Sequence, residues 1–197
     1  ENTISGIKRL KDLRLGIIGC GRIGTSLARK SKEIFGSIGI YDPFLPSGFE
    51  KSISVIRFED LTSLLKNCDV VSLHVPLKED TLGLVNKQFL DSMRKGAVLI
   101  NTARGELISD IPTLIGKIYD NSLWGVGLDV LGEEPPKNKQ KELLLDLYRL
   151  NKGLNGRFIL NPHTSYFSDE SYKEMRVLAA QNGMNILNNY PPLNRIV

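Results

Sequence analysis

A glycine-rich segment near the start of the chain has the spacing of a phosphate-binding loop. Residues 19–24 read Gly-Cys-Gly-Arg-Ile-Gly, which matches G-x-G-x-x-G, and they lie between an apolar run and a helix-period segment. In this context Gly19 allows a tight turn, Gly21 lets backbone approach a pyrophosphate, and Gly24 lets the helix pack closely. Because a helix amino end also attracts phosphate, the segment predicts a dinucleotide site.

A carboxylate follows at the position where such sites recognise ribose. Asp42 comes directly after the second predicted strand, about 20 residues past the loop, and can accept hydrogen bonds from both ribose hydroxyls. It would repel a 2′-phosphate, and no arginine follows it in residues 42–45. We therefore expect NAD rather than NADP. The simpler alternative is a glycine-rich turn and a solvated aspartate.

Polar side chains also follow three later predicted strands. Arg104 follows one, Asp129 with Glu133 and Glu134 follows the next, and His163 follows the last. Taken singly, they could be a surface arginine, solvated acids and a structural histidine. Ligands of open α/β folds bind at the carboxyl edge of the sheet, and a guanidinium suits a carboxylate. Their shared edge therefore favours a site for a 2-oxo acid.

The elements that must position these residues alternate along the chain. We expect strands at residues 13–18, 37–41, 53–58, 69–75, 97–101, 123–130 and 158–161. We expect helices at residues 23–35, 59–66, 86–93, 109–119, 142–148 and 168–189. Ser109 is expected to cap the fourth helix, and Ile23, Leu27, Ile34 and Phe35 to face the sheet from the first. This order predicts an α/β fold, a doubly wound parallel sheet (Rossmann fold) with helices on both faces.

Composition narrows the class of protein. The 197 residues are 41% hydrophobic and 24% charged, which excludes disordered and fibrous chains. The only cysteines, Cys20 and Cys68, are far apart, so we expect small core residues in a reducing compartment, with no disulfide and no metal.

Charge and hydropathy narrow the partners. The longest apolar runs fall far short of the roughly 20 residues that span a bilayer, so we expect a soluble protein without a membrane partner. The net charge is +4, but basic residues alternate with acidic ones, and we expect no nucleic acid.

Six segments together resemble the D-isomer-specific 2-hydroxyacid dehydrogenase family. The order and spacing of the resemblance hold over residues 8–190. The segments are residues 19–24, Tyr-Asp-Pro-Phe at 41–44, Ser-Leu-His-Val-Pro at 72–76, Asn-Thr-Ala-Arg-Gly at 101–105, Leu-Asp-Val at 128–130 with Glu-Pro at 134–135, and Asn-Pro-His at 161–163.

The resemblance implies hydride transfer between NAD(H) and a small D-2-hydroxy acid or 2-oxo acid. It implies that Arg104 binds the substrate carboxylate and polarises its carbonyl, and that His163 is the acid in reduction and the base in oxidation. Glu134 would orient the imidazole; it is preferred to Glu133 because the family's acid directly precedes a proline. His74 is expected only to flank the cofactor pocket.

The resemblance also implies a set of residues that contact the cofactor. Arg22 and Ile23 would contact the pyrophosphate, and Asp129 the nicotinamide carboxamide. The complete expected set is Gly19, Gly21, Arg22, Ile23, Gly24, Asp42, Val75, Pro76, Thr102, Ala103, Arg104, Asp129 and His163.

Two departures from the family pattern leave alternatives open. Residues 164–167 read Thr-Ser-Tyr-Phe where most members have small residues, which is closer to D-lactate dehydrogenases and to the C-terminal-binding-protein corepressors. Residues 131–157 form a longer segment than usual. The alternatives are an NAD-sensing corepressor-type binding protein and a phosphonate or formate dehydrogenase, although Glu134 argues against formate.

The place of the loop indicates the domain organisation. In the family the glycine loop follows most of a substrate domain, whereas here it begins at Gly19. We therefore expect residues 1–197 to be an isolated NAD-binding domain, with the substrate domain absent and little turnover by the chain alone. A homodimer through this domain and a cytoplasmic location are further expectations.

Overall fold

The computed structural model describes residues 7–132, 144, 146, 154 and 156–193. It divides into two compact units, residues 1–162 and 163–197, and each is described by itself. The strands are β1 (Arg14–Ile18), β2 (Ser37–Tyr41), β3 (Ile56–Arg57), β4 (Val70–Leu73), β5 (Ala97–Asn101), β6 (Leu123–Leu128) and β7 (Phe158–Leu160). The helices are η1 (Leu10–Asp12), α1 (Arg22–Lys30), α2 (Phe49–Ser52), α3 (Leu61–Asn67), α4 (Lys87–Ser92), η2 (Gly105–Leu107), α5 (Ile111–Tyr119) and α7 (Asp169–Leu187).

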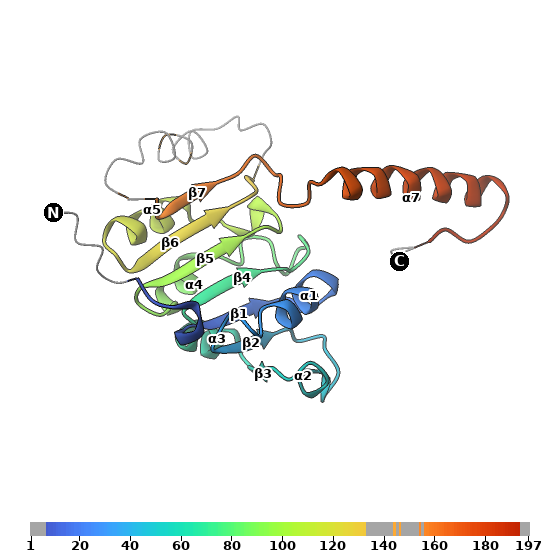
Figure 1. Ribbon diagram of the computed structural model, residues 1–197. Helices are drawn as coiled ribbons and strands as arrows, with labels where there is room; N and C mark the ends of the chain where they lie inside the picture. Colours follow the sequence, from blue (N-terminus) through green and yellow to red (C-terminus); the bar gives the residue numbers. More distant parts are fainter. Residues whose placement is uncertain (1–6, 133–143, 145, 147–153, 155, 194–197) are drawn as a thin grey trace. The chain divides into compact units, whose positions relative to one another are not determined.

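The seven strands form one parallel sheet in the order β3-β2-β1-β4-β5-β6-β7 (Figure 1). The chain winds outward in both directions from the β1–β4 pair, so the topological switch point lies between these two strands. In open α/β sheets ligands bind at the carboxyl edge of this point. The predicted doubly wound fold is confirmed.

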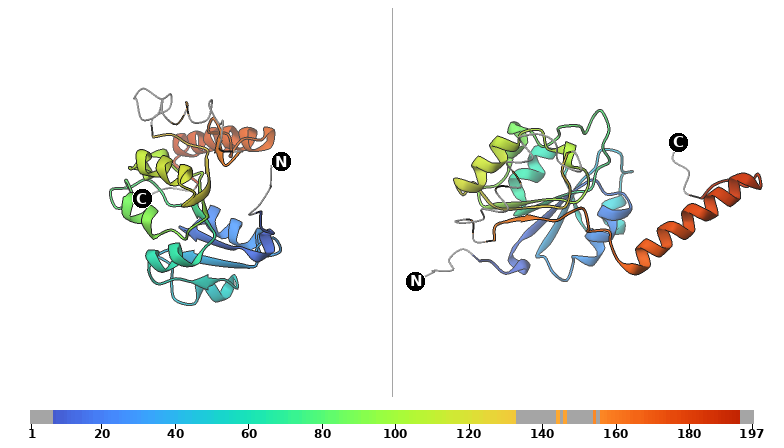
Figure 2. Two further views of the ribbon diagram at one scale, coloured as in Figure 1. Left: turned by 90° about the vertical axis from the view of Figure 1, so that its left-hand side faces the viewer. Right: turned by 90° about the horizontal axis from the view of Figure 1, so that it is seen from above.

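Two hydrophobic clusters hold the helices against opposite faces of the sheet. Ala28 of α1 packs with Leu15, Ile17 and Ile38 on one face. On the other face α3, α4 and α5 pack on a larger cluster that includes Val71. Figure 2 shows helices on both sides of the sheet in the first unit. Residues on both faces of β1 and β4 are buried, which explains why these two strands are nearly continuous apolar runs rather than alternating ones.

Short polar side chains begin the helices of the larger layer. Asp60 accepts a hydrogen bond from the Ser63 amide at 2.8 Å at the start of α3. At the start of α5 the cap is Asp110, which accepts from the Thr113 amide at 3.0 Å. The prediction of Ser109 as this cap is wrong, because its hydroxyl donates to the Gly83 carbonyl instead.

The first helix is shorter than predicted and faces the sheet with different residues. It ends at Lys30 rather than residue 35, because the amides of residues 34 and 35 both donate to the Ser31 carbonyl and close a turn. Ile23 and Ile34 are 67% and 45% exposed, so the prediction that they face the sheet is wrong. The buried contacts come from Gly24 and Ala28, whose small size brings the helix close to the strands.

The strand predicted at residues 53–58 is reduced to Ile56–Arg57, and α2 precedes it. The sequence did not predict α2, which begins after Gly48 in a left-handed conformation with φ of 88°. Ile53 ends this helix and is 2% exposed. Its apolar character therefore reflects packing against the core and not strand pairing.

The other boundaries match the predicted ones or differ from them by at most two residues. The helix predicted at residues 142–148 lies outside the described residues except for Leu144 and Asp146. In the second unit, Ser168 caps α7. Both cysteines are buried and unpaired, as predicted. No helix within the described ranges is long and apolar enough to cross a bilayer.

Candidate cofactor and substrate site

The three glycines of the loop differ in what a Cβ atom would contact at each position. Gly19 has φ of +85°, and a Cβ there would lie 2.7 Å from the His74 carbonyl. A Cβ on Gly24 would lie 2.1 Å from the Gly19 carbonyl oxygen. A Cβ on Gly21 would meet nothing within 4 Å. The turn and the close packing predicted from the spacing are therefore present, and the backbone at Gly21 is open to an approaching group.

The amino end of α1 offers its own donors to such a group. Gly21 is the N-cap, so no cap side chain bonds to the first amides of α1. Nor does the first turn contain an acid. The unsatisfied amides of a helix amino end bind anions. A groove of about 600 Å³ runs beside this end and includes the cations Arg22, Arg29 and Lys30 in its lining.

Asp42 is tied to the glycine loop through its carboxylate. Oδ2 accepts from the Cys20 amide at 2.8 Å, and Oδ1 accepts from the Phe44 amide at 3.0 Å. An ionised carboxylate has about four acceptor sites, so Asp42 retains capacity for two further donors, such as a pair of hydroxyls. The Cys20 contact also sets the distance between Asp42 and the loop.

Val75 and Pro76 follow β4 beneath the loop. A Cβ on Gly19 would lie 2.8 Å from Val75 Cγ1, so this side chain supports the turn directly. His74 Nε2 lies 2.9 Å from Ser72 Oγ, and burial lowers the pKa of the imidazole. His74 is thus a neutral group in the wall behind the loop at neutral pH.

The Arg104 turn is built by a buried amide at the end of β5. Asn101 is completely buried; its Nδ2 donates to the Arg104 carbonyl at 2.8 Å and its Oδ1 accepts from the Ala103 amide at 3.0 Å. Thr102 and Ala103 lie between these anchors. The Arg104 side chain is exposed, and Nη1 donates to the Ala103 carbonyl. Sequence reasoning did not assign Asn101 a role, although an Asn at a strand end is a turn signal.

A second unassigned residue, Gly105, brings the chain after β6 against this turn. A Cβ there would lie 2.0 Å from the Leu131 carbonyl carbon and 2.2 Å from the Gly132 nitrogen. Asp129, 3% exposed, lies just upstream, and its amide donates to the Asn101 carbonyl at 2.9 Å. Asp129 and Arg104 therefore share one end of the β5–β6 pair. Glu134 lies outside the described residues.

His163 is the first residue of the second unit. Its backbone is in the left-handed region with φ of 54°, and its ring makes an edge contact with Tyr166 at 6.0 Å between centroids. In the first unit, the Asn161 amide donates to the Leu128 carbonyl, which places the segment before His163 at the same sheet edge as Asp129.

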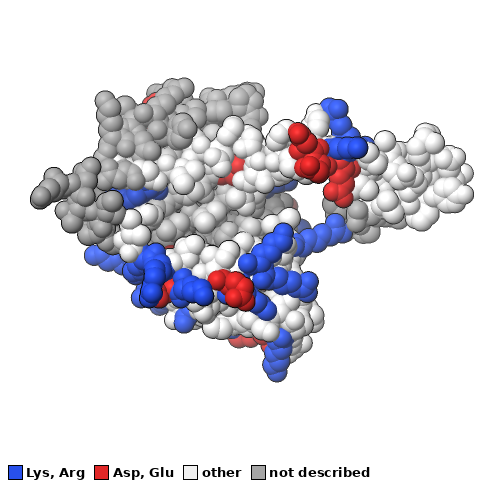
Figure 3. All heavy atoms as spheres, in the orientation of Figure 1, with Lys and Arg blue, Asp and Glu red and all other residues white. Residues whose placement is uncertain are grey.

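Basic side chains gather on the α1 side of the first unit. Figure 3 shows Lys and Arg along the lower part of the face, from its left-hand end to the region where α1 and α2 lie in Figure 1, with fewer acids among them. The charges that alternate along the sequence are therefore less mixed in space. A positive surface beside the loop favours an anionic ligand.

Comparison with known proteins agrees with this geometry. Residues 2–165 match the family model described as D-isomer specific 2-hydroxyacid dehydrogenase, NAD binding domain. The chain belongs to this family.

Two relatives of known name and one solved structure illustrate the match. A glyoxylate reductase of Korarchaeum cryptofilum is 34% identical over 168 residues, 85% of this chain and 47% of the relative. A glycerate dehydrogenase of Methylorubrum extorquens is 35% identical over 167 residues, 85% of this chain and 46% of the relative. The NAD complex of a D-isomer specific 2-hydroxyacid dehydrogenase from Lactobacillus delbrueckii ssp. bulgaricus has a TM-score of 0.80 at 28% identity, covering 96% of this chain and 58% of that one. The chain spans about half the length of the named relatives.

The cofactor of this 2-hydroxyacid dehydrogenase domain is NAD, and the loop fits it. The open backbone at Gly21 and the amides at the start of α1 suit a pyrophosphate, and the remaining acceptor capacity of Asp42 suits a ribose diol. Within the described part of the chain, no three His, Cys, Asp or Glu side chains are grouped to hold a metal ion.

Proposed function

We propose that this chain is the NAD-binding domain of a dehydrogenase that interconverts a small 2-oxo acid and a D-2-hydroxy acid. The observation that carries the proposal is the place of the Arg104 turn. It lies at the carboxyl end of β5, two strands from β1 and its glycine loop, or roughly 10 Å at the usual strand spacing. A cofactor held at the loop and an acid held by Arg104 would then be neighbours.

In this proposal Arg104 binds and polarises the substrate. Its guanidinium would pair with the carboxylate in a bidentate fashion, and its positive charge would stabilise negative charge developing on the carbonyl oxygen. The Asn101 bonds hold the Arg104 backbone while its side chain remains exposed. This combination suits a residue that must meet a diffusing acid.

His163 would move the proton. NADH, when bound, would supply the hydride. A ring nitrogen of His163 would give its proton to the carbonyl oxygen, or take it back in the oxidation. Glu134 is proposed to orient this ring, as the family pattern implies. Val75, Pro76, Thr102, Ala103 and Asp129 are proposed to line the cofactor cleft.

Binding of NADH should be tested by calorimetry. Trp124, the only tryptophan, lies near the amino end of β6. It is five residues before Asp129, or roughly 17 Å away along the strand. Its fluorescence is a poor reporter of the opposite edge. Titration with NADH should give heat with a single-site isotherm, and the absence of binding would contradict the proposal.

Turnover should be tested in the full protein with a panel of 2-oxo acids. Arg104→Gln should lower kcat/KM for the 2-oxo acid by about 100-fold or more. Lys95→Gln is the matched control, because this exposed cation precedes β5 at its other end. A control that loses as much activity would contradict the role of Arg104.

A second candidate is an NAD-sensing binding protein of the corepressor type. It is favoured by Tyr166 and Phe167, whose side chains are 54% and 55% exposed and could contact a protein partner. The same panel separates the two candidates. NADH binding without any 2-oxo acid turnover that depends on His163 would support this second function over the first.

A further inference from the structure

Four aromatic rings of the second unit form a continuous chain that begins at His163. The His163 and Tyr166 rings meet edge to face, with centroids 6.0 Å apart and planes at 89°. Tyr166 meets Phe167 at 6.4 Å, and Phe167 meets Tyr172 at 6.0 Å. The Arg176 guanidinium carbon lies 4.3 Å from the Tyr172 ring centroid. The imidazole is therefore the end of an aromatic row that rests on α7.

The first turn of α7 fixes the segment that carries these rings. Ser168 and Ser171 form a capping box, in which each side chain bonds to the other residue's amide. The Ser171 hydroxyl also donates to the Tyr166 carbonyl at 2.7 Å. The Phe167 amide donates to the Thr164 carbonyl at 2.9 Å and closes a turn. Tyr166 is thus held by its backbone from the helix.

The backbone of His163 needs such support. Its φ of 54° lies in the left-handed region, which a residue with a Cβ seldom adopts unless its surroundings determine it. An aromatic neighbour restricts rotation of the imidazole without having to bond to the nitrogens that carry a proton. Offset and edge contacts of this kind are the preferred aromatic geometries.

We propose that Tyr166 is a positioning residue that sets the orientation of the His163 ring, and that the first turn of α7 in turn positions Tyr166. The importance of that orientation for chemistry rests on the proposed function of His163; the ring contact itself does not. Because more than half of the Tyr166 side chain is exposed, replacing it should leave the fold intact.

Proton NMR of the histidine rings tests the contact directly. The chain has two histidines, so His74 of the first unit is an internal reference. In the unmodified protein the His163 and Tyr166 rings should show nuclear Overhauser contacts. Tyr166→Leu should remove the ring-current shift of the His163 signals and leave those of His74 in place. Tyr166→Phe should retain that shift, because the phenol hydroxyl is not needed for an edge contact.

Tyr190→Leu is the matched control, since Tyr190 follows α7 and is 66% exposed; it should not move the His163 signals. The proposal is overturned if the unmodified protein shows no contact between the two rings, or if Tyr166→Phe shifts His163 as far as Tyr166→Leu does. The amide signals of residues 168–171 report whether the helix start has moved, and a change there in the Phe variant would also count against it.

Kinetics separate this proposal from the proposed function. In the full protein, Tyr166→Leu should lower kcat by roughly tenfold to hundredfold, as small misplacements of reacting groups do, with KM for NADH unchanged and kcat restored in Tyr166→Phe. Unchanged kcat would overturn the positioning role. If no 2-oxo acid is turned over while the NMR contact is present, the proposed function fails and the structural link between the rings stands.

Discussion

Gly21 and Gly24 differ in what a methyl group would meet, so they separate ligand binding from folding. Gly21→Ala adds its Cβ to open space. It should leave the thermal midpoint nearly unchanged but weaken NADH binding at least about tenfold, or about 1.4 kcal/mol, because the methyl occupies the approach to the loop. Calorimetry and thermal unfolding measure the two effects.

Gly24→Ala should give the reverse order of effects. Its Cβ would lie 2.1 Å from the Gly19 carbonyl oxygen, so α1 must move. The free energy of unfolding should therefore fall by roughly 1–3 kcal/mol. Gly116→Ala in α5 is the control, since it also adds a methyl to open space and should stabilise the helix by up to about 1 kcal/mol. Equal NADH affinity in Gly21→Ala and Gly116→Ala would contradict the assigned role of Gly21.

Asp42 supports the loop through the Cys20 amide and is proposed to select the cofactor, and two substitutions distinguish these effects. Asp42→Asn removes the charge but keeps an acceptor for the Cys20 amide, so it should reduce the preference for NADH over NADPH with little loss of stability. Asp42→Ala should also leave that amide without its acceptor and cost about 1–3 kcal/mol. Measured affinities for both cofactors test this; an unmodified protein without preference would contradict it.

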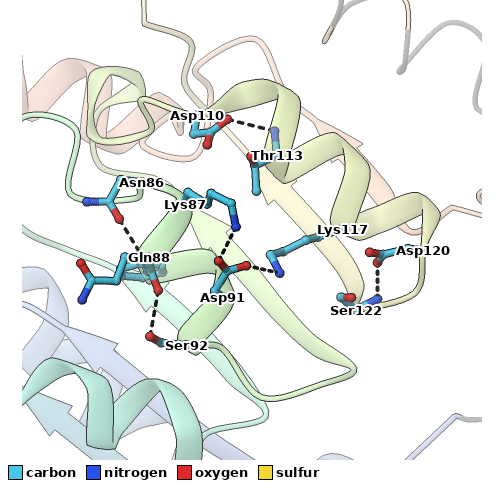
Figure 4. Close-up of polar contacts among 11 residues, drawn as sticks. Asn86, Lys87, Gln88, Asp91, Ser92, Asp110, Thr113, Lys117, Asp120 and Ser122 are labelled. Carbon is cyan, nitrogen blue, oxygen red and sulfur yellow. Dashed lines mark hydrogen bonds and ion pairs between the residues drawn. The ribbon is translucent and has the colours of Figure 1, made fainter.

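At the scale of elements, one aspartate ties α4 to α5. Asp91 accepts from Lys87 of its own helix at 2.6 Å and from Lys117 of α5 at 2.8 Å (Figure 4). The Lys117 bond, followed by the Lys87 bond, lowers the pKa of Asp91 to about 2. The two ion pairs help to hold α4 against α5 in the helix layer that covers one face of β4, β5 and β6.

The sign of the pH dependence follows from that lowered pKa. A carboxyl whose pKa falls on folding stabilises the folded state at pH values above its pKa in the unfolded chain, which is about 4. This stabilisation is lost as the pH falls through the folded-state pKa of about 2. The stability difference between the unmodified protein and Asp91→Asn should therefore be constant near neutral pH and vanish near pH 2. Added salt should reduce it, because the group is exposed.

Denaturant unfolding across this pH range measures the effect, with Asp80→Asn as the control. Asp80 is exposed and has no ion pair among the described residues. A difference for Asp91→Asn that persists unchanged to pH 2 would contradict the role of the two lysines.

At the scale of the whole molecule, cofactor binding should stabilise the first unit. The proposed site takes residues from the ends of β1, β2, β4, β5 and β6, so a bound dinucleotide would join strands far apart in the sequence. NADH at 100 times its dissociation constant should add about 2.7 kcal/mol and raise the thermal midpoint by several degrees. NADPH at the same concentration should add less, and an equal shift would contradict the cofactor assignment.

The parallel sheet could be predicted because burial on both faces leaves a strong local signal. In β4 all four residues are buried and three of them are apolar, and the segments between the strands have helical period. The roles of Gly19 and Gly24 could be predicted for a similar reason, because a tight turn and a close helix contact depend on a missing Cβ within one short segment.

Other features depend on contacts between distant segments. Helix α2 has four residues, too few for a periodic pattern, and Ile53 resembled a strand residue because a buried apolar side chain has the same local appearance in either state. Ser109 and Asp110 are both able to cap a helix, and only the position of the Gly83 carbonyl decides between them.

The sequence by itself therefore determined the sheet class, the dinucleotide loop and the types of residue available at its edge, since each depends on residue type and spacing within a short stretch. The tertiary structure decided which backbone lies against Gly105, how Asn101 holds the Arg104 turn, and that the His163 ring rests on Tyr166. These contacts depend on the distances and directions between side chains in the folded chain. They produce no periodic pattern in the sequence, so the sequence could not predict them.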